Sequence, residues 1–171
     1  LLKRMLSQAE RVFCADADIN EISLSFLEYL NQPYRYIANT HKHNAGVKAK
    51  EIFSLNKFMK ALNKEDEYLV CCDSKTHAEI IGNLNMKQDY LLITSEGYYY
   101  SKTKTWNKDK IPPDLDSHKR VIFSPKIIYG LDSTMARPVY LYMKGRTISP
   151  VAMVQQLCRN RNITQLNYLF S

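Results

Sequence analysis

Two segments of the sequence are apolar along their whole length, and they constrain the fold more than any other feature. Residues 68–72 read Tyr-Leu-Val-Cys-Cys, and residues 90–94 read Tyr-Leu-Leu-Ile-Thr. A strand without alternating polar side chains is buried on both faces, which is typical of a central strand in a parallel sheet. Helical patterns lie between such segments. The sequence therefore predicts a three-layer α/β fold, a mostly parallel sheet with helices on both faces.

The remaining segments alternate between strand and helix patterns at near-regular intervals. Further strands are expected at residues 12–15, 34–37, 48–53, 119–124, 139–143 and 166–170. Helices are expected at residues 1–11, from Asn20 until Pro33, at 56–62, at 76–83 and after Ser149. The functional groups of such a fold gather where its strands end. Those ends carry Asp16 and Asp18, Asp73 and Ser74, residues 94–97 and residues 124–132.

The last expected helix has a clear start signal. Ser149 is a suitable N-cap, and Pro150 suits the first helical position. One face of this helix is expected to carry Val151, Val154 and Cys158, which fall at helical spacing. Two arginines would stand in its last turn, where they could simply complement the helix dipole. The glutamines beside them favour another interpretation, a group that reaches an anion across a cleft.

Composition and charge narrow the class of protein. The chain has 171 residues, 45% hydrophobic and 24% charged, which suits one domain, or one domain with an attached piece. It does not begin with Met, so we expect an excerpt of a larger protein. Apolar runs stay below the roughly 18 residues of a membrane span, and no signal peptide pattern is present. Four cysteines without metal-type spacing indicate reduced thiols of an intracellular protein. The net charge of +7 favours a polyanionic partner.

Two nucleotide-binding signatures are missing from the sequence. No Gly-Lys pair occurs, so a P-loop is absent, and the five glycines never approach the spacing of a dinucleotide fold. Asp66 and Glu67 precede a strand, whereas a magnesium-binding acid of the Walker type follows one; we interpret them as solvated charge. The chain alone is therefore not a self-sufficient nucleotidase of the P-loop kind.

Four segments together carry a resemblance to a known family. Residues 68–75, Tyr-Leu-Val-Cys-Cys-Asp-Ser-Lys, look like motif IV, and residues 121–132, which end in Gly-Leu-Asp, look like motif V. Residues 155–161, Gln-Gln-Leu-Cys-Arg-Asn-Arg, look like motif VI, and residues 12–18 stand where motif III lies. The chain resembles the second RecA-like domain of superfamily 2 helicases, above all the origin-binding and replicative helicases of large DNA viruses. The resemblance makes 1–18 the end of the preceding helicase segment or a first strand, and 19–171 the C-terminal RecA-like domain.

The resemblance implies an ATPase cleft shared with an N-terminal RecA-like domain that holds most of the ATP and Mg²⁺. Arg159 or Arg161 would reach the γ-phosphate as an arginine finger, since a guanidinium suits the charge of the transition state. The arginines stand two apart and Cys158 replaces a glycine, which leaves open which of them is the finger. Gln155 and Gln156 would bridge to the cleft or position water, the alternative being a polar helix surface.

The other implied contacts are with nucleotide and DNA. Gly130 and Asp132 would lie beside the nucleotide, or else form a turn glycine and a capping aspartate. DNA phosphates would be met by Ser74, Lys75, Ser124 and Lys126, although a strand–helix turn favours such residues anyway. Residues 98–100 are tyrosines, and the lysines and tryptophan that follow suit a single-stranded DNA track unless the tyrosines enter the core. The candidates there are Lys102, Lys104 and Trp106; His41 and His43 are interpreted as surface residues.

Three functions remain open at this level. The first is the C-terminal motor half of an ATP-dependent DNA helicase, inactive alone, at a site of viral, nuclear or cytoplasmic DNA replication. The second is a non-catalytic DNA-binding or scaffold domain with a helicase-like fold. The third is a phosphate-handling enzyme that uses Asp16 and Asp18 as metal ligands.

Overall fold

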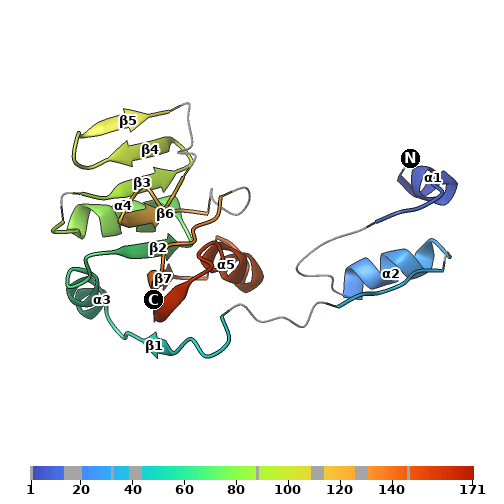
Figure 1. The fold of residues 1–171 in the computed structure, drawn as a ribbon, viewed down its shortest axis with the longest axis horizontal. Coiled ribbons are helices and arrows are strands. Elements are labelled where there is room, and N and C mark those ends of the chain that lie inside the picture. The colour runs from blue at the N-terminus through green and yellow to red at the C-terminus, as the bar shows by residue number, and fades with distance from the viewer. Residues whose placement is uncertain are drawn as a thin grey trace. The chain divides into compact units, whose positions relative to one another are not determined.

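The contacts of the chain divide it into two compact units, residues 1–41 and residues 42–171. The resemblance to helicase domains predicts a domain boundary earlier in the chain, after Asp18. The structure, a computed structural model, describes residues 2–13, 21–31, 33–38, 44–87, 89–108, 114–125, 131–145 and 147–171. Figure 1 shows the fold.

The first unit contains two short helices, α1 (Leu2–Gln8) and α2 (Glu21–Tyr29). Helix α2 buries none of its residues, and Ile22, on its expected apolar face, is 81% exposed. The strands expected at 12–15 and 34–37 are wrong wherever the structure describes those residues. Aromatic and β-branched residues favour a strand only where a neighbouring strand and a packed face receive them. The described part of this unit offers neither.

The second unit is built on an eight-stranded sheet, which confirms the expected α/β fold with a mostly parallel sheet. Its strand order is β1-β8-β7-β2-β6-β3-β4-β5. Neighbouring strands are parallel, except that β4 runs antiparallel to both β3 and β5. The strands are β1 (Ala49–Glu51), β2 (Tyr68–Cys72), β3 (Leu91–Thr94), β4 (Gly97–Tyr100), β5 (Thr105–Asn107), β6 (Arg120–Phe123), β7 (Arg137–Met143) and β8 (Ile163–Phe170).

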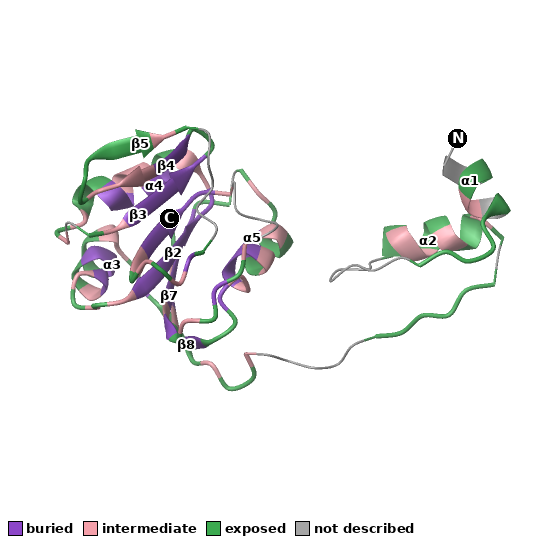
Figure 2. Cartoon of the chain, turned by 45° about the horizontal axis from the view of Figure 1, so that its top comes forward, coloured by how far each residue is buried: buried purple, intermediate pink, exposed green. Residues whose placement is uncertain are grey.

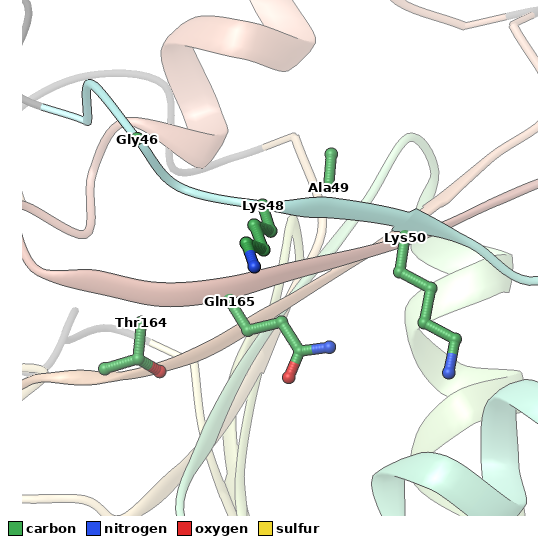
Figure 3. Close-up of a pocket in the computed structure, with 6 residues that line it drawn as sticks. All are labelled: Gly46, Lys48, Ala49, Lys50, Thr164 and Gln165. Carbon is green, nitrogen blue, oxygen red and sulfur yellow. The ribbon is translucent and has the colours of Figure 1, made fainter.

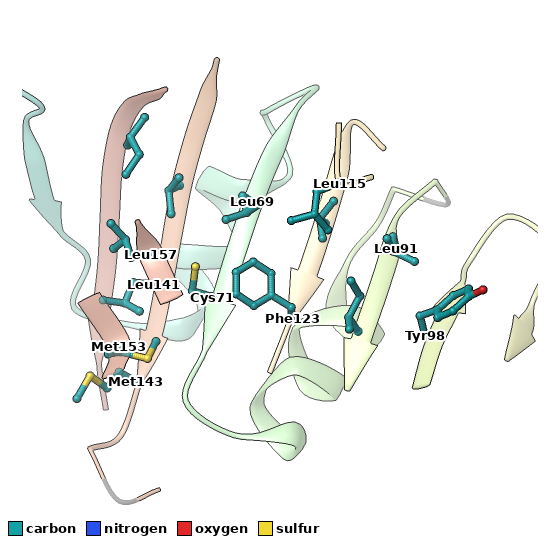
Figure 4. Packing of buried hydrophobic residues seen from close by; sticks show 14 residues of the cluster. Leu69, Cys71, Leu91, Tyr98, Leu115, Phe123, Leu141, Met143, Met153 and Leu157 are labelled. Atoms are coloured by element: carbon teal, nitrogen blue, oxygen red, sulfur yellow. The ribbon is translucent and has the colours of Figure 1, made fainter. Parts of the chain in front are cut away.

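Helices cover both faces of this sheet. On one face, α3 (Leu55–Leu62) and α4 (Lys75–Leu84) share a buried cluster with β2, β6 and β7. On the other face, α5 (Pro150–Leu157) packs Met153 and Leu157 into a second cluster around Cys71 and Phe123 (Figure 4). Every residue of β2 is buried because both of its faces are covered, as its unbroken apolar sequence predicts (Figure 2). No helix among the described residues is long and apolar enough to cross a membrane.

A serine caps each of the three helices, and its hydroxyl accepts a backbone N–H of the first turn. The caps are Ser54, Ser74 and Ser149. Such caps satisfy amide donors that a helix start otherwise leaves unpaired. Helix α5 therefore begins where the sequence predicts, with Pro150 in its first turn.

The face of α5 that carries Val151 and Val154 is not the face that packs against the sheet. Val151 and Val154 are 51% and 59% exposed, whereas the buried residues are Met153, Gln156 and Leu157. Apolar residues recur at helical spacing on more than one face of this helix, and the position of the sheet decides which of these faces is buried.

The hairpin of β4 and β5 was not predicted, since no strand was expected between residues 94 and 119. Gly97, the first residue of β4, has a φ of +130° and lies beside the end of β5. A Cβ atom at this position would lie 2.2 Å from the carbonyl oxygen of Asn107. Only glycine permits both the positive φ and this close approach of the two strands.

Candidate functional site

The first candidate site lies where the strand order of the sheet reverses. The chain passes from β2 to β3, returns to β6 between them, and then crosses to β7 on the other side of β2. Ligands of open α/β sheets bind outside the carboxyl ends of the strands at such a switch point. A hollow of about 420 Å³ is found there, between the loops that follow these strands. We call it the carboxyl-edge hollow; it is lined by Asp73, Ser74, Lys75, Ser95, Ser124, Pro125, Thr147 and Ile148.

Asp73 holds the walls of this hollow together. Its carboxylate accepts the backbone N–H groups of Lys144 (2.7 Å) and Gly145 (3.0 Å), and it bonds the ring Nδ1 of His77 at 2.5 Å. The hydroxyl of Thr147 donates to the Asp73 carbonyl. Asp73 is 1% exposed, so its role is to join the end of β2 to the loop after β7 rather than to meet a ligand.

Three of the expected DNA-binding residues line the hollow, and their side chains differ in their contacts and burial. Ser74 uses its hydroxyl to cap α4, as the alternative interpretation of a strand–helix turn foresaw. Lys75 bonds Glu96 and lies 3.7 Å from Glu79; the Glu96 carboxylate raises the pKa of the Lys75 ammonium. Ser124 is 2% exposed and lines the hollow.

The second candidate site joins residues far apart in the sequence. Asp132 accepts a hydrogen bond from Arg159 (Nη1 to Oδ1, 3.2 Å) and another from Arg161 (Nη2 to Oδ2, 2.8 Å). The side chains of Arg159, Arg161 and Asp132 are 18%, 42% and 46% exposed, so the cluster opens to the surface. It contains two positive charges and one negative charge. We call these three residues the arginine cluster.

The arginines do not stand in the last turn of α5. The helix ends at Leu157 with Cys158 as its C-cap, and Arg159 and Arg161 lie in the turn before β8. This turn is held against 132–135 because Ser133 and Asn160 form a β-bridge and the Asn160 amide donates to the Met135 carbonyl. The placement of both arginines in the last turn of α5 is therefore wrong, and their guanidinium groups bond Asp132.

The arginine cluster and the carboxyl-edge hollow lie at opposite edges of the sheet. The bridge between Ser133 and Asn160 precedes Arg137 and Ile163, the paired first residues of β7 and β8. The cluster thus lies beyond the amino ends of these strands, whereas the hollow lies beyond carboxyl ends. A ligand at one site and a ligand at the other would contact different edges of the domain.

The two guanidinium groups set the ionisation of Asp132. Partial burial acts to raise the pKa of its carboxyl group. The hydrogen bonds and charges of Arg161 and Arg159 outweigh burial, so the pKa of Asp132 lies below its ordinary value. The carboxylate is thus charged at neutral pH and occupies the position that an incoming anion would take on the guanidinium groups.

A buried arginine holds the backbone next to the arginine cluster in place. Arg137 is 1% exposed, and its guanidinium donates to the carbonyl of His118 (2.6 Å) and the hydroxyl of Ser133 (2.9 Å), with Asp116 at 3.7 Å. The Asp116 carboxylate accepts the Ser133 hydroxyl at 2.5 Å, and it also accepts the backbone N–H and hydroxyl of Thr134. This network fixes the backbone that follows Asp132.

The network predicts a stability change in acid. Burial acts to raise the pKa of Asp116, but its hydrogen bonds from Ser133 and Thr134 lower it from 3.8 to about 2. Because the folded pKa lies below the unfolded value, the stabilisation is complete above about pH 4 and is lost as the pH falls through about 2. Urea unfolding of the native chain over this window should lose about 2 kcal/mol more than that of Asp116→Asn. Parallel curves for the two proteins would contradict this role of Asp116.

The two glutamines of α5 occupy different environments. Gln155 is half-buried. Gln156 is fully buried, and its amide donates to the Cys72 carbonyl at 3.4 Å, while its Oε1 has no partner among the described residues. Gln156 is therefore neither a polar surface residue nor in contact with open solvent beside the arginine cluster.

The lysines and tryptophan of the β4–β5 hairpin are exposed. Lys102 and Lys104 lie in its turn, and Trp106 on β5 is 44% exposed. Tyr98 is buried, and Tyr99 and Tyr100 are half-buried, so the tyrosines pack largely against the domain. The hairpin therefore combines the two interpretations given for it, with packed tyrosines and an exposed basic and aromatic surface.

Several expected residues lie outside the described part of the chain. These are Gly130, Lys126, Asp16, Asp18, His41 and His43. Among the residues that the structure describes, no three His, Cys, Asp or Glu side chains form a group that could hold a metal ion. The described cysteines are free: Cys71 and Cys72 are buried, which raises the pKa of both thiols, and Cys158 is half-buried.

A second hollow, of about 650 Å³, lies at the β1 edge of the sheet (Figure 3). Lys48 and Lys50 line it from the β1 side, and Thr164 and Gln165 from β8. All its lining residues are exposed, and Gln165 donates its side-chain amide to Asn167 rather than into the hollow. We do not regard this hollow as a binding site.

Sequence reasoning missed the residues that support the two sites. Asp116 stands in a polar loop, and Arg137 precedes a proline at the start of a strand, where nothing in the local pattern indicates burial. Thr147 likewise lies in a short polar loop. Each acquires its role from contacts with residues at least 17 positions away, such as those of Asp116 with Ser133 and Thr134.

Comparisons of the chain with protein families, with characterised proteins and with solved structures found no match. The basis for an inference of function is therefore the geometry of the two sites.

Proposed function

We propose that the chain is a RecA-like domain forming the C-terminal motor half of an ATP-dependent DNA helicase of the viral replication type. It supplies an arginine finger and part of the DNA track. ATP and Mg²⁺ are held mainly by an N-terminal RecA-like domain, since this sequence has no P-loop. A three-layer fold with a mostly parallel sheet is the architecture that such a domain requires.

The observation that carries the proposal is the arginine cluster. The candidate motif V ends at Asp132 and the candidate motif VI ends at Arg161, and the two ends are bonded to each other across 29 residues of sequence. In the proposed motor, a nucleotide phosphate takes the place of the Asp132 carboxylate as the partner of one guanidinium. Planar guanidinium groups suit a phosphoryl group because they can donate two hydrogen bonds at once and remain charged at any physiological pH.

The carboxyl-edge hollow provides the DNA contact of the proposal. The first turn of α4 presents backbone N–H groups there, and the Lys75 ammonium and the Ser124 hydroxyl lie beside them. Helix N-termini, lysines and hydroxyl groups are common ligands of nucleic-acid phosphates, and such contacts position a strand without reading its sequence. Opening and closing of the ATPase cleft at the amino edge of the sheet would then move a DNA strand that is bound at the carboxyl edge.

The proposal is tested in the protein that combines this chain with its P-loop domain. Single-stranded DNA should stimulate its ATP hydrolysis, and ATP analogues should change its affinity for DNA. DNA binding that ignores ATP, with no stimulated hydrolysis, would instead support the non-catalytic scaffold function. Magnesium-dependent phosphate release by the 171-residue chain alone would contradict the dependence on another domain.

A further inference from the structure

One row of side chains crosses the sheet on the face covered by α3 and α4. Paired residues place Tyr140, Val70, Ile122 and Leu92 side by side on β7, β2, β6 and β3. The row continues through Tyr99 on β4 to Trp106 on β5. The first four are buried in a common cluster, and the last is 44% exposed. The row thus passes from the core to the surface at its β5 end.

The exposure of Trp106 results from where the covering helices stop. Gly82 brings α4 against β3, so close that a Cβ atom there would lie 3.4 Å from the Tyr90 hydroxyl and 3.7 Å from Leu92. Among the described helices of the second unit, α4 lies against β3 on this face, and none lies over β4 or β5 (Figure 1). Tyr99 is therefore half-buried, and Trp106 presents its ring at the rim of the sheet. An exposed tryptophan forgoes a large gain from burial, which makes this position notable.

The Trp106 ring is held in a defined position. Tyr99 lies directly opposite it in the antiparallel pair, and the ring centroids are 5.3 Å apart with planes inclined at 37°. The neighbouring Asn107 points its amide to the Tyr98 hydroxyl at 2.7 Å, which fixes the strand from its other face. A rigid aromatic platform of this kind binds a planar partner at a low cost in conformational entropy.

Positive charge surrounds the platform. Lys104 precedes β5 and Lys108 follows it, each two residues from Trp106, and Lys102 lies in the same turn as Lys104. All three are exposed. Glu96 is a nearby acidic group: its hydrogen bond from Lys75 lowers its pKa, and the charge of Lys108 lowers it further. The charge favours an anionic partner, and the platform favours one with planar groups.

We propose that this surface, formed by Tyr99, Trp106, Lys102, Lys104 and Lys108, binds single-stranded nucleic acid by stacking a base on Trp106. The inference rests on the proposed function in taking DNA as the partner, and it adds that the hairpin contacts bases. Unpaired bases offer a π-face to the indole ring while the lysines neutralise phosphates, and such binding tolerates any sequence. Duplex DNA has no free base face, so it should bind this surface more weakly.

The test uses Trp106 as its own probe, since it is the single tryptophan of the sequence. The 171-residue chain is titrated with an oligothymidylate of about 12 nucleotides, within the range of single-strand sites, and with an abasic strand of equal length. We expect the oligothymidylate to quench the fluorescence and the abasic strand to leave it almost unchanged. Equal quenching by the abasic strand would show that charge alone acts here and would overturn the inference.

A variant series measures the stacking contribution by anisotropy of a labelled oligothymidylate. Trp106→Ala should bind about 5- to 160-fold more weakly, because a stacked base contributes roughly 1–3 kcal/mol. Trp106→Phe should recover most of the affinity, and circular dichroism verifies that both variants fold. Unchanged affinity of Trp106→Ala would refute the inference.

Failure of this inference and failure of the proposed function are distinguishable. If the motor hydrolyses ATP with DNA while Trp106→Ala binds DNA as the native chain does, only the stacking surface is wrong. If the native chain is quenched by oligothymidylate while the protein with its P-loop domain shows no DNA-stimulated hydrolysis, the motor is wrong and the stacking surface stands.

Discussion

Arg161→Ala is expected to reduce DNA-stimulated ATP hydrolysis by about 10³- to 10⁵-fold in the protein that carries this chain and its P-loop domain. The guanidinium stabilises negative charge that develops on the transferred phosphoryl group, so the loss should appear in kcat, with little change in the KM for ATP. Arg161 is the more exposed member of the arginine cluster, at 42% against 18% for Arg159. Arg159→Ala should therefore cause the smaller loss.

Two comparisons make this result specific to the guanidinium groups. Arg161→Lys keeps the charge but loses the planar pair of donors, so it should remain well below the native rate. Lys119→Ala removes an exposed cation near the start of β6, 65% exposed and paired with Glu67 at 3.4 Å, and should hydrolyse ATP as the native protein does. Native turnover in both arginine-to-alanine variants would remove the finger assignment.

Arg137→Met is expected to lower the free energy of unfolding by about 3–5 kcal/mol, because it removes one partner of a buried, charged hydrogen-bond network. The side chain is 1% exposed and donates to the carbonyl groups of Leu115, His118 and Lys119 and to the Ser133 hydroxyl. Those acceptors would each lose one donor, and the partly buried Asp116 would lose a cation 3.7 Å away. The methionine side chain would fill much of the site and limit the entry of water.

Urea unfolding of the 171-residue chain measures this effect, with thermal unfolding as a second readout expected to fall on the order of 10 °C. Arg161→Met is the matched control, since it makes the same chemical change at an exposed position and should cost less than about 1 kcal/mol. Arg137→Lys, which keeps a charge but fewer donors, should lie between the two. Equal losses for Arg137→Met and Arg161→Met would contradict the supporting role of Arg137.

The sequence by itself determined the central part of the sheet. The unbroken apolar segments at 68–72, 121–123 and 139–143 became β2, β6 and β7, because an apolar run of strand length can be satisfied only by burial on both faces. Helix starts were also local, since Ser54, Ser74 and Ser149 cap their own first turns. These features depend on neighbours a few residues away.

Tertiary structure alone decided the edges of the sheet and the first unit. Tyr34, Tyr36 and Ile37 have the composition of a strand and form none, whereas the basic segment around Trp106 pairs as β5. A strand forms only beside another strand, and the sequence of a segment does not show whether the fold brings another strand next to it. The buried face of α5 was likewise chosen by the position of the sheet.

The residues of the candidate sites also fall into two groups, those that the sequence indicates and those that only the tertiary structure reveals. The sequence pointed to Asp132, Arg159 and Arg161 as candidates, but their mutual hydrogen bonds depend on the Ser133–Asn160 bridge, which joins two distant turns. Asp116 and Arg137, which hold those turns, carried no sequence signal, because the free energy of a buried ion depends on what surrounds it and not on its neighbours in the chain.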